Sequence, residues 1–286
     1  MIPAAFDYKR ASSVEEALKL LADSDGEGKI LAGGHSLIPT LKLRLARPET
    51  VIDISRIAEL SGISEDGDTI VIGALTTHDA VASSAIVQAK APALAAAAAS
   101  IGDLQVRNCG TIGGALAHSD PAADYPASIL ALDAEMIIQG PDGERAVEAV
   151  DFFVDIFATA VQENELLTQV RVPAQAANTA SAYIKFPNPA SGYAVVGCAA
   201  KVTIENGNCT EARVGFTGVA NVAFRDGAVE AALTGSACDD STIAAATAQA
   251  AQGQDCMSDT FASETYRAEM AKVFAKRAVA AAAAAV

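Results

Sequence analysis

Two short glycine-containing stretches hold the residues best suited to chemistry. One is Ala32-Gly33-Gly34-His35-Ser36 and the other is Thr111-Ile112-Gly113-Gly114. Each combines a glycine pair with a hydroxyl residue, and a glycine pair lets successive main-chain N–H groups face one way in conformations that other residues avoid. Such N–H groups form a concave anion site. One stretch could hold one phosphate, and two could hold the pyrophosphate of a dinucleotide.

A lone glycine pair more often marks a turn, so the two stretches carry weight only together. The chain has no Gly-x-Gly-x-x-Gly and no Gly-x-x-x-x-Gly-Lys-Ser/Thr pattern, which argues against a standard NAD site or P-loop. Ser36 stands where a helix is expected to begin, and free N–H groups at a helix start favour an anion. Thr111 supplies the equivalent hydroxyl in the second stretch. Together these features favour a phosphate-bearing ligand.

The elements predicted around the first stretch place it at the end of a strand. Residues 29–32 are expected to form a short buried strand, and residues 37–44 suit a helix whose first turn points back at the loop. Upstream, Ser13 to Glu16 form a capping box that starts a helix. Residues 50–54 are a further predicted strand.

The second stretch lies in a longer predicted segment of helices and strands. We expect strands over residues 69–74, 134–139 and 165–172, and helices over residues 77–101, with a helix start at Pro92, and 126–132.

The last third of the chain is expected to form a separate unit. Residues 175–179 are a polar, low-complexity stretch and a plausible boundary, and Asn206-Gly207 predicts a hairpin between residues 193–204 and 209–219. The remainder is predicted to be helical. In its last helix one apolar stripe is predicted and the alanine tail is expected to fray; the stripe comprises Tyr266, Met270, Val273 and Phe274.

Composition excludes several classes of function. The 286 residues suffice for about two domains, and a net charge of −15 argues against a nucleic-acid partner. No apolar run is long enough to span a bilayer, and the first residues lack the basic region of a secretory signal, so we expect a cytoplasmic protein. The five cysteines are scattered without a Cys-x-x-Cys pair, which argues against a zinc or iron–sulfur site in this chain.

Residues 32–39 with Lys42 and Arg44, together with residues 106–114, resemble the FAD-binding subunit of molybdenum hydroxylases. The opening Met1-Ile2-Pro3 and residues 31–48 are most similar to medium chains of the carbon monoxide dehydrogenase type. The likeness covers essentially the whole chain. It implies an α+β fold with a two-part, PCMH-type FAD-binding region over residues 1–174, divided at about residue 55. A C-terminal domain, residues 175–286, would add a small antiparallel sheet and a helical cluster and close over the flavin.

The resemblance also implies which residues contact a noncovalently bound FAD. Ile101 would pack near its adenine or ribose, Asp124 would hydrogen-bond the cofactor, and Tyr193 would lie beside the isoalloxazine ring. The implied set comprises Leu31, Ala32, Gly33, Gly34, His35, Ser36 and Leu37 from the first loop, Thr111, Ile112, Gly113, Gly114 and Ala115 from the second, and Ile101, Asp124, Leu167, Lys185 and Tyr193.

Each isolated position has a simpler structural interpretation. Asp124 could cap a helix that begins near Pro126, Leu167 could be a core strand residue, Lys185 a solvated strand residue, and Tyr193 the start of a hairpin. His35 is expected to be placed by its backbone. His118 and Asp120 could form an acid–base pair, but a polar loop explains them equally well.

Three departures from the family pattern affect what can be inferred. Ala115 stands where Asn or Ser often follows the glycine pair, and Gly102-Asp103-Leu104 replaces a commoner Asp-Pro, which predicts a less rigid loop. Residues 185–193 lack the basic cluster typical of carbon monoxide dehydrogenases. Carbon monoxide is therefore only one candidate substrate of the complex, beside an aldehyde or an N-heterocycle.

The implied function is electron relay without a catalytic residue or metal in this chain. A large molybdenum subunit with molybdopterin would oxidise the substrate, and a small [2Fe–2S] subunit would pass single electrons to the FAD. The complex is expected to be a dimer of heterotrimers, cytoplasmic or peripheral at the inner membrane. A self-contained FAD-dependent oxidase or reductase remains an alternative, as does a binding or assembly protein that has lost FAD.

Overall fold

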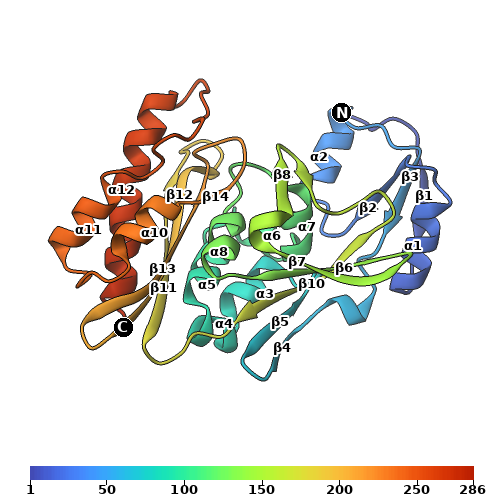
Figure 1. Cartoon of the computed structure of the whole chain (residues 1–286). Coiled ribbons are helices and arrows are strands. Elements are labelled where there is room, and N and C mark those ends of the chain that lie inside the picture. The colour runs from blue at the N-terminus through green and yellow to red at the C-terminus, as the bar shows by residue number, and fades with distance from the viewer.

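Three β-sheets, each built from one stretch of the chain, organise the fold (Figure 1). The computed structural model describes residues 1–286. In Figure 1 the sheets follow one another across the molecule, with helices α5 (Pro92–Ala99) and α8 (Tyr125–Ala131) between the second and the third. A small ribbon of two strands is the only other sheet.

The first sheet is parallel and has three strands in the order β1-β3-β2. Helix α1 begins at Ser13, whose hydroxyl accepts the Glu16 N–H at 3.1 Å as predicted. The Glu16 carboxylate instead accepts the Ser12 N–H at 2.7 Å. The elements are β1 (Asp7–Arg10), α1 (Val14–Ala22), β2 (Gly28–Leu31), α2 (Leu37–Lys42), β3 (Thr50–Asp53) and the 3₁₀ turn η1 (Ala58–Leu60).

The second sheet is antiparallel and joins two hairpins through one later strand, β10, in the order β4-β5-β10-β6-β7. Several of its branched apolar side chains, such as Ile70 and Val170, are fully buried, whereas others, such as Val71, are half-buried. The elements are β4 (Ile63–Asp66), β5 (Thr69–Gly73), β6 (Glu135–Gly140), β7 (Gly143–Glu148), α9 (Ala149–Phe152), β8 (Phe153–Asp155), β9 (Ala158–Thr159) and β10 (Leu166–Pro173).

The helical segment predicted over residues 77–101 contains one break that was not predicted, at Ser84, besides the one implied by the helix start at Pro92. Three short helices occupy this range, because Ser84 and Ala91 leave the helical conformation. The Ser84 hydroxyl caps the next helix by accepting the Val87 N–H at 3.4 Å, and Pro92 begins a helix as predicted. The helices of this region are α3 (His78–Ser83), α4 (Ala85–Lys90), α5 (Pro92–Ala99), α6 (Leu104–Arg107), α7 (Ile112–His118) and α8 (Tyr125–Ala131).

The third sheet is an antiparallel meander of four strands. Asn206 and Gly207 have positive φ values of 51° and 81° in its central hairpin, as the Asn-Gly pair predicted. The first strand, β11, was not among the predicted ranges. The strands are β11 (Thr179–Pro187), β12 (Ala194–Glu205), β13 (Asn208–Thr217) and β14 (Phe224–Arg225).

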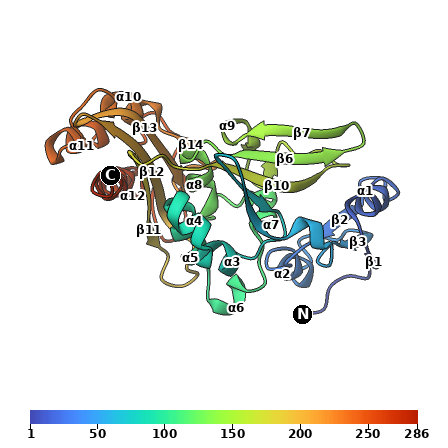
Figure 2. The same ribbon diagram turned by 90° about the horizontal axis from the view of Figure 1, so that it is seen from below.

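Helices cover both faces of the third sheet (Figure 2). Helices α5 and α8 pack on the face toward the second sheet, α10 (Gly227–Leu233) and α12 (Glu264–Ala283) pack on the outer face, and α11 (Asp240–Thr247) packs against α10 and α12. None of the helices combines the length and apolarity needed to cross a membrane.

The apolar stripe predicted for the last helix is confirmed for Phe274, which is buried, and for Met270, which packs against the core, but it is wrong for Tyr266 and Val273. Tyr266 and Val273 are 42% and 37% exposed, and the side that faces the sheet consists mainly of alanines, with Phe274 and Arg267. Small side chains let the helix approach the strands closely. The side of the helix that is buried is therefore the one that packs closely on the sheet, not the one with the largest apolar side chains. The alanine tail does not fray before Ala283, because Ala278 and Ala282 are fully buried.

The third sheet is joined to the middle part of the chain by a common hydrophobic cluster and by ion pairs. Tyr183 and Ala199 belong to the same hydrophobic cluster as the second sheet. At the end of α8, Asp133 accepts from Lys201, at 2.6 Å, and from two arginines of β13 and β14. These contacts position the third sheet over the loops that carry the predicted site residues.

Candidate cofactor-binding site

The first glycine loop presents an uninterrupted run of free backbone donors. None of the N–H groups of residues 33–37 donates to an acceptor in the chain. Gly34 has a φ of +71°, and the Ser36 hydroxyl makes no capping bond with α2. The His35 ring turns back on its own loop, with Nδ1 2.9 Å from the Gly33 carbonyl oxygen. Consecutive unpaired N–H groups of this kind suit the oxygens of a phosphate.

The two glycine loops are in direct contact. A Cβ on Gly33 would lie 2.1 Å from the Cys109 carbonyl oxygen and 2.8 Å from the Gly110 Cα, and the Cys109 thiol donates to the Gly33 carbonyl at 3.5 Å. Gly33 does not have positive φ. Glycine is therefore needed at position 33 because the backbones of the two loops meet there. Of the pair, only Gly34 has the positive φ that favours glycine.

The second glycine pair does not form an equivalent set of free donors, which corrects the prediction of two matching anion sites. Carbonyls of the segment after β5 take the N–H groups of Ile112, at 3.0 Å, and Gly113, at 2.9 Å. The Thr111 hydroxyl takes the Gly114 N–H at 3.2 Å, so it caps α7. A Cβ on Gly113 would lie 2.5 Å from the Ala74 Cβ. Gly113 thus lets α7 pack closely on the segment that follows β5. Of the N–H groups of this stretch, only that of Thr111 stays free.

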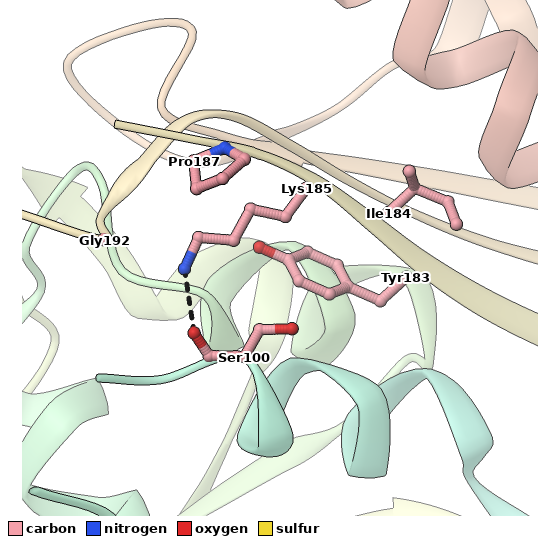
Figure 3. A pocket seen from close by; sticks show the side chains of 6 residues that line it. All are labelled: Ser100, Tyr183, Ile184, Lys185, Pro187 and Gly192. Carbon is pink, nitrogen blue, oxygen red and sulfur yellow. Dashed lines mark hydrogen bonds between the residues drawn. The ribbon is translucent and has the colours of Figure 1, made fainter. Parts of the chain in front are cut away.

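Asp124 lies at the centre of a buried cluster that joins α8 to the third sheet. Its Oδ1 accepts the Tyr183 hydroxyl at 2.5 Å and its Oδ2 accepts the Lys185 ammonium at 2.9 Å. Lys185 also donates to the Ser100 carbonyl at 3.0 Å, and Figure 3 shows its side chain extended toward Ser100 beside the Tyr183 ring. Asp124 makes no capping bond with α8, and the Lys185 side chain is only 8% exposed. The simpler interpretations of both residues are therefore wrong.

Burial dominates the electrostatics of this cluster. It raises the pKa of Asp124, while the Lys185 charge and the Tyr183 hydrogen bond act in the opposite direction. The pKa of Tyr183 lies well above its usual value, first because of burial and then because of the Asp124 charge. Tyr183 thus remains a hydrogen-bond donor. Beside the cluster is a cavity of about 410 Å³ lined by Ser100, Tyr183, Ile184, Lys185, Pro187 and Gly192.

The segment that leads to Asp124 is held by the ends of the central strands of the third sheet. The Ala194 N–H donates to the Ala122 carbonyl at 3.1 Å, and the Thr217 hydroxyl lies 2.9 Å and 2.7 Å from the carbonyls of Pro121 and Ala123. Sequence reasoning missed Tyr183 and Thr217. The period of two along a strand places Tyr183 on the face of Lys185, which is the signal that could have identified it.

The remaining predicted contacts occupy different environments. Leu167 is 4% exposed in the core, which agrees with its simpler interpretation, whereas Tyr193 is 45% exposed and precedes β12 instead of starting it. Ile101 is half-buried, and Arg107 donates to its carbonyl at 3.0 Å and to that of Gly102 at 2.9 Å. The loop predicted to be less rigid is therefore held by Arg107 and by Asp103, which caps α6. Leu31, Ala32, Leu37 and Ala115 are half-buried at the two glycine loops, and Ile112 is buried there.

Sequence reasoning also missed a buried histidine, His78, which lies beside Gly110 at the start of the second glycine loop. His78 is 5% exposed, and its Nδ1 lies 3.0 Å from the Tyr125 hydroxyl oxygen. Burial, followed by the charges of His35 and Arg107, lowers its pKa to about 4. His78 is therefore neutral at physiological pH.

The lowered pKa of His78 predicts that the folded chain loses stability in acid. Its pKa is 6.5 ordinarily and about 4 in the fold, so the unfolded chain takes up the proton first. Its contribution should be fully present above about pH 7, fall as the pH drops through about 6.5, and be lost near pH 4, a change of about 3 kcal/mol. Urea unfolding of wild type and His78→Gln across this range should show their stability difference shrinking toward acid. Two parallel curves would contradict the prediction.

Comparison with known protein families identifies the class of protein to which this chain belongs. A family model for the FAD-binding domain in molybdopterin dehydrogenases matches residues 4–175, and one for the C-terminal domain of carbon monoxide dehydrogenase flavoproteins matches residues 181–282. The chain therefore belongs to the FAD-binding subunits of molybdenum hydroxylases, of the carbon monoxide dehydrogenase type. This confirms the resemblance and the α+β fold with an FAD-binding part, and it makes the chain an oxidoreductase component.

Individual relatives match over nearly the whole chain. The carbon monoxide dehydrogenase medium chain of Hydrogenophaga pseudoflava is 42% identical, covering 98% of this chain and 97% of that one. The 6-hydroxypseudooxynicotine dehydrogenase complex subunit alpha of Paenarthrobacter nicotinovorans is 40% identical over 98% and 95%. The solved structure of the Hydrogenophaga enzyme lacking the Mo-pyranopterin moiety superposes with a TM-score of 0.97 at 44% identity, over 100% and 99% of the two chains. Near-equal identity to proteins named for different substrates leaves the substrate unassigned.

Proposed function

We propose that this chain relays electrons from an iron–sulfur subunit, through its FAD, to an external acceptor. The observation that carries the proposal is the run of free N–H groups over residues 33–37, in a chain that matches FAD-binding subunits from end to end. When bound, FAD can take up electrons singly and hand them on as a pair. The chain's own residues are required to bind, orient and shield the cofactor.

We further propose that the first glycine loop takes the pyrophosphate of FAD, with the Thr111 N–H as an additional donor. Free donors and a glycine with positive φ support this assignment. The second loop then acts by fixing the first in place, through the contact of Gly33 with Cys109. Ile101, Asp124, Leu167 and Lys185 are proposed to line the rest of the site.

The Asp124 cluster is proposed to fix the third sheet against the cofactor-binding region. Its ion pair, only 5% and 8% exposed, joins the two parts and excludes water from their contact. We retain the division into residues 1–174 and 175–286, because each sheet lies within one of these parts and the two family matches meet between them.

Partners are inferred from the family. We propose a small [2Fe–2S] subunit and a large molybdopterin subunit, assembled with this chain as a dimer of heterotrimers in the cytoplasm. Substrate chemistry would belong to the large subunit.

The experiment is to load the isolated chain with FAD and assay it alone and in its complex. Denaturation should release free FAD, and the isolated flavoprotein should oxidise neither carbon monoxide, an aldehyde nor an N-heterocycle with a dye acceptor. Purification from the native host should give three subunits. Turnover by the isolated chain would refute the relay and support a self-contained oxidase, and release of FMN would refute the cofactor assignment.

Tyr193 is proposed to lie beside the isoalloxazine ring. The half-exposed phenol is free to pack on a flavin, so Tyr193→Ala should raise flavin fluorescence and shift the midpoint potential while changing FAD affinity less than about threefold. Tyr193→Phe keeps the aromatic ring and should behave like wild type. Tyr266→Ala, at a similarly exposed tyrosine, is the matched control. Unchanged fluorescence and potential in Tyr193→Ala would remove Tyr193 from the site.

A further inference from the structure

His78 is a buried polar residue that the function proposed above does not use. It opens α3, and its backbone N–H donates to the Gly110 carbonyl at 3.0 Å. A Cβ on Gly110 would lie 2.6 Å from His78 Nε2, and Gly110 is also the residue that a Cβ on Gly33 would approach to 2.8 Å. His78 and the first glycine loop thus flank the same glycine.

The partner of His78 determines which ring nitrogen carries its proton. Tyr125 is fully buried, and the only hydrogen-bond partner of its hydroxyl is His78 Nδ1 at 3.0 Å. A buried hydroxyl left without an acceptor is costly, so Tyr125 donates to Nδ1. The neutral ring therefore carries its hydrogen on Nε2.

The Nε2–H group has no acceptor within the chain. Nδ1 makes the only side-chain hydrogen bond of His78. Among fully buried side-chain polar atoms only Arg267 Nε lacks a partner, so His78 Nε2 retains some contact with solvent. The permanently charged group whose field reaches the ring is the Arg107 guanidinium at the end of α6. An oriented donor thus stands beside the glycine loops, in surroundings that favour an anion.

We propose that His78 is a positioning residue that donates a hydrogen bond from Nε2 to a phosphate oxygen of the FAD pyrophosphate. The inference rests on the proposed placement of that pyrophosphate at the first glycine loop. Tyr125 fixes the tautomer that makes Nε2 a donor. Gly110 lacks a Cβ that would block the ring.

The test compares FAD binding by the full chain carrying His78→Phe, which has no donor, with His78→Gln, which keeps an N–H group. His78→Phe should raise the dissociation constant about tenfold or more, as expected for a hydrogen bond to a charged group. His78→Gln should stay within about threefold of wild type. The ³¹P resonances of bound FAD should shift in both variants, and His118→Gln, at a second histidine with lowered pKa, should leave affinity and spectrum unchanged.

The outcomes separate this inference from the proposed function. Wild-type affinity and ³¹P shifts in His78→Phe would overturn it, as would equal weakening in both variants accompanied by equal loss of thermal stability without FAD. Failure of the wild-type chain to bind FAD would instead refute the proposed function. If His78→Phe does not fold, Tyr125→Phe provides the test: it releases the tautomer and should weaken FAD binding and move a ³¹P resonance, and unchanged values would overturn the inference.

Discussion

Gly33→Val should abolish measurable FAD binding while leaving the third sheet folded. The new Cβ would lie 2.1 Å from the Cys109 carbonyl oxygen, a backbone atom that cannot rotate away. The first loop must then move, and its run of free N–H groups no longer converges on one anion. Overpacking and the loss of several charge-assisted hydrogen bonds together predict an affinity at least about 1,000-fold lower. Equilibrium dialysis with FAD measures the effect.

A control variant distinguishes damage to the first glycine loop from the general effect of replacing a glycine by valine. Gly227→Val adds a side chain where nothing lies within 4 Å of the new Cβ, so FAD binding should be unchanged. Near-wild-type affinity in a folded Gly33→Val protein would show that the first loop does not hold the pyrophosphate.

Asp124→Ala should be strongly destabilising. It would leave the Lys185 ammonium, in a side chain only 8% exposed, without its counter-charge, and the buried Tyr183 hydroxyl without an acceptor. Breaking a buried ion pair from one side costs about 3–5 kcal/mol. Chemical unfolding measures the loss, and bound FAD should be lost as the third sheet detaches from α8.

The double variant Asp124→Ala/Lys185→Met tests the stated cause. Removing both charges eliminates the orphaned ammonium, so it should recover about half or more of the lost stability. Asp142→Ala, in the exposed turn before β7, is the matched control and should change stability by less than about 0.5 kcal/mol. If Asp124→Ala is as mild as this control, the cluster does not hold the two parts together.

Local sequence patterns identified many of the elements around the site. The helix cap at Ser13 and the Asn206-Gly207 hairpin formed as predicted, because each depends on bonds and dihedral angles within a few residues. The break at Ser84, within the helical segment over residues 77–101, was missed for the complementary reason. Ser84 can either continue a helix or cap the next one, and packing of the short helices decided between them.

The last helix shows the same limit at the level of packing. Counting large apolar residues selected Tyr266 and Val273, which are substantially exposed, over alanines that are fully buried. Which side of a helix is buried depends on how closely the facing sheet approaches. That distance is a property of two elements far apart in the chain.

The sequence by itself determined the family and identified the two glycine-containing loops, because a missing Cβ and the dihedral freedom it brings are properties of single residues. Only the tertiary structure decided which glycine loop keeps free donors, since the carbonyls after β5 take those of the second. It likewise decided that Asp124 is paired and Lys185 buried. The partners of Asp124 lie 59 and 61 positions away in sequence, and folding alone sets the contacts between such distant residues.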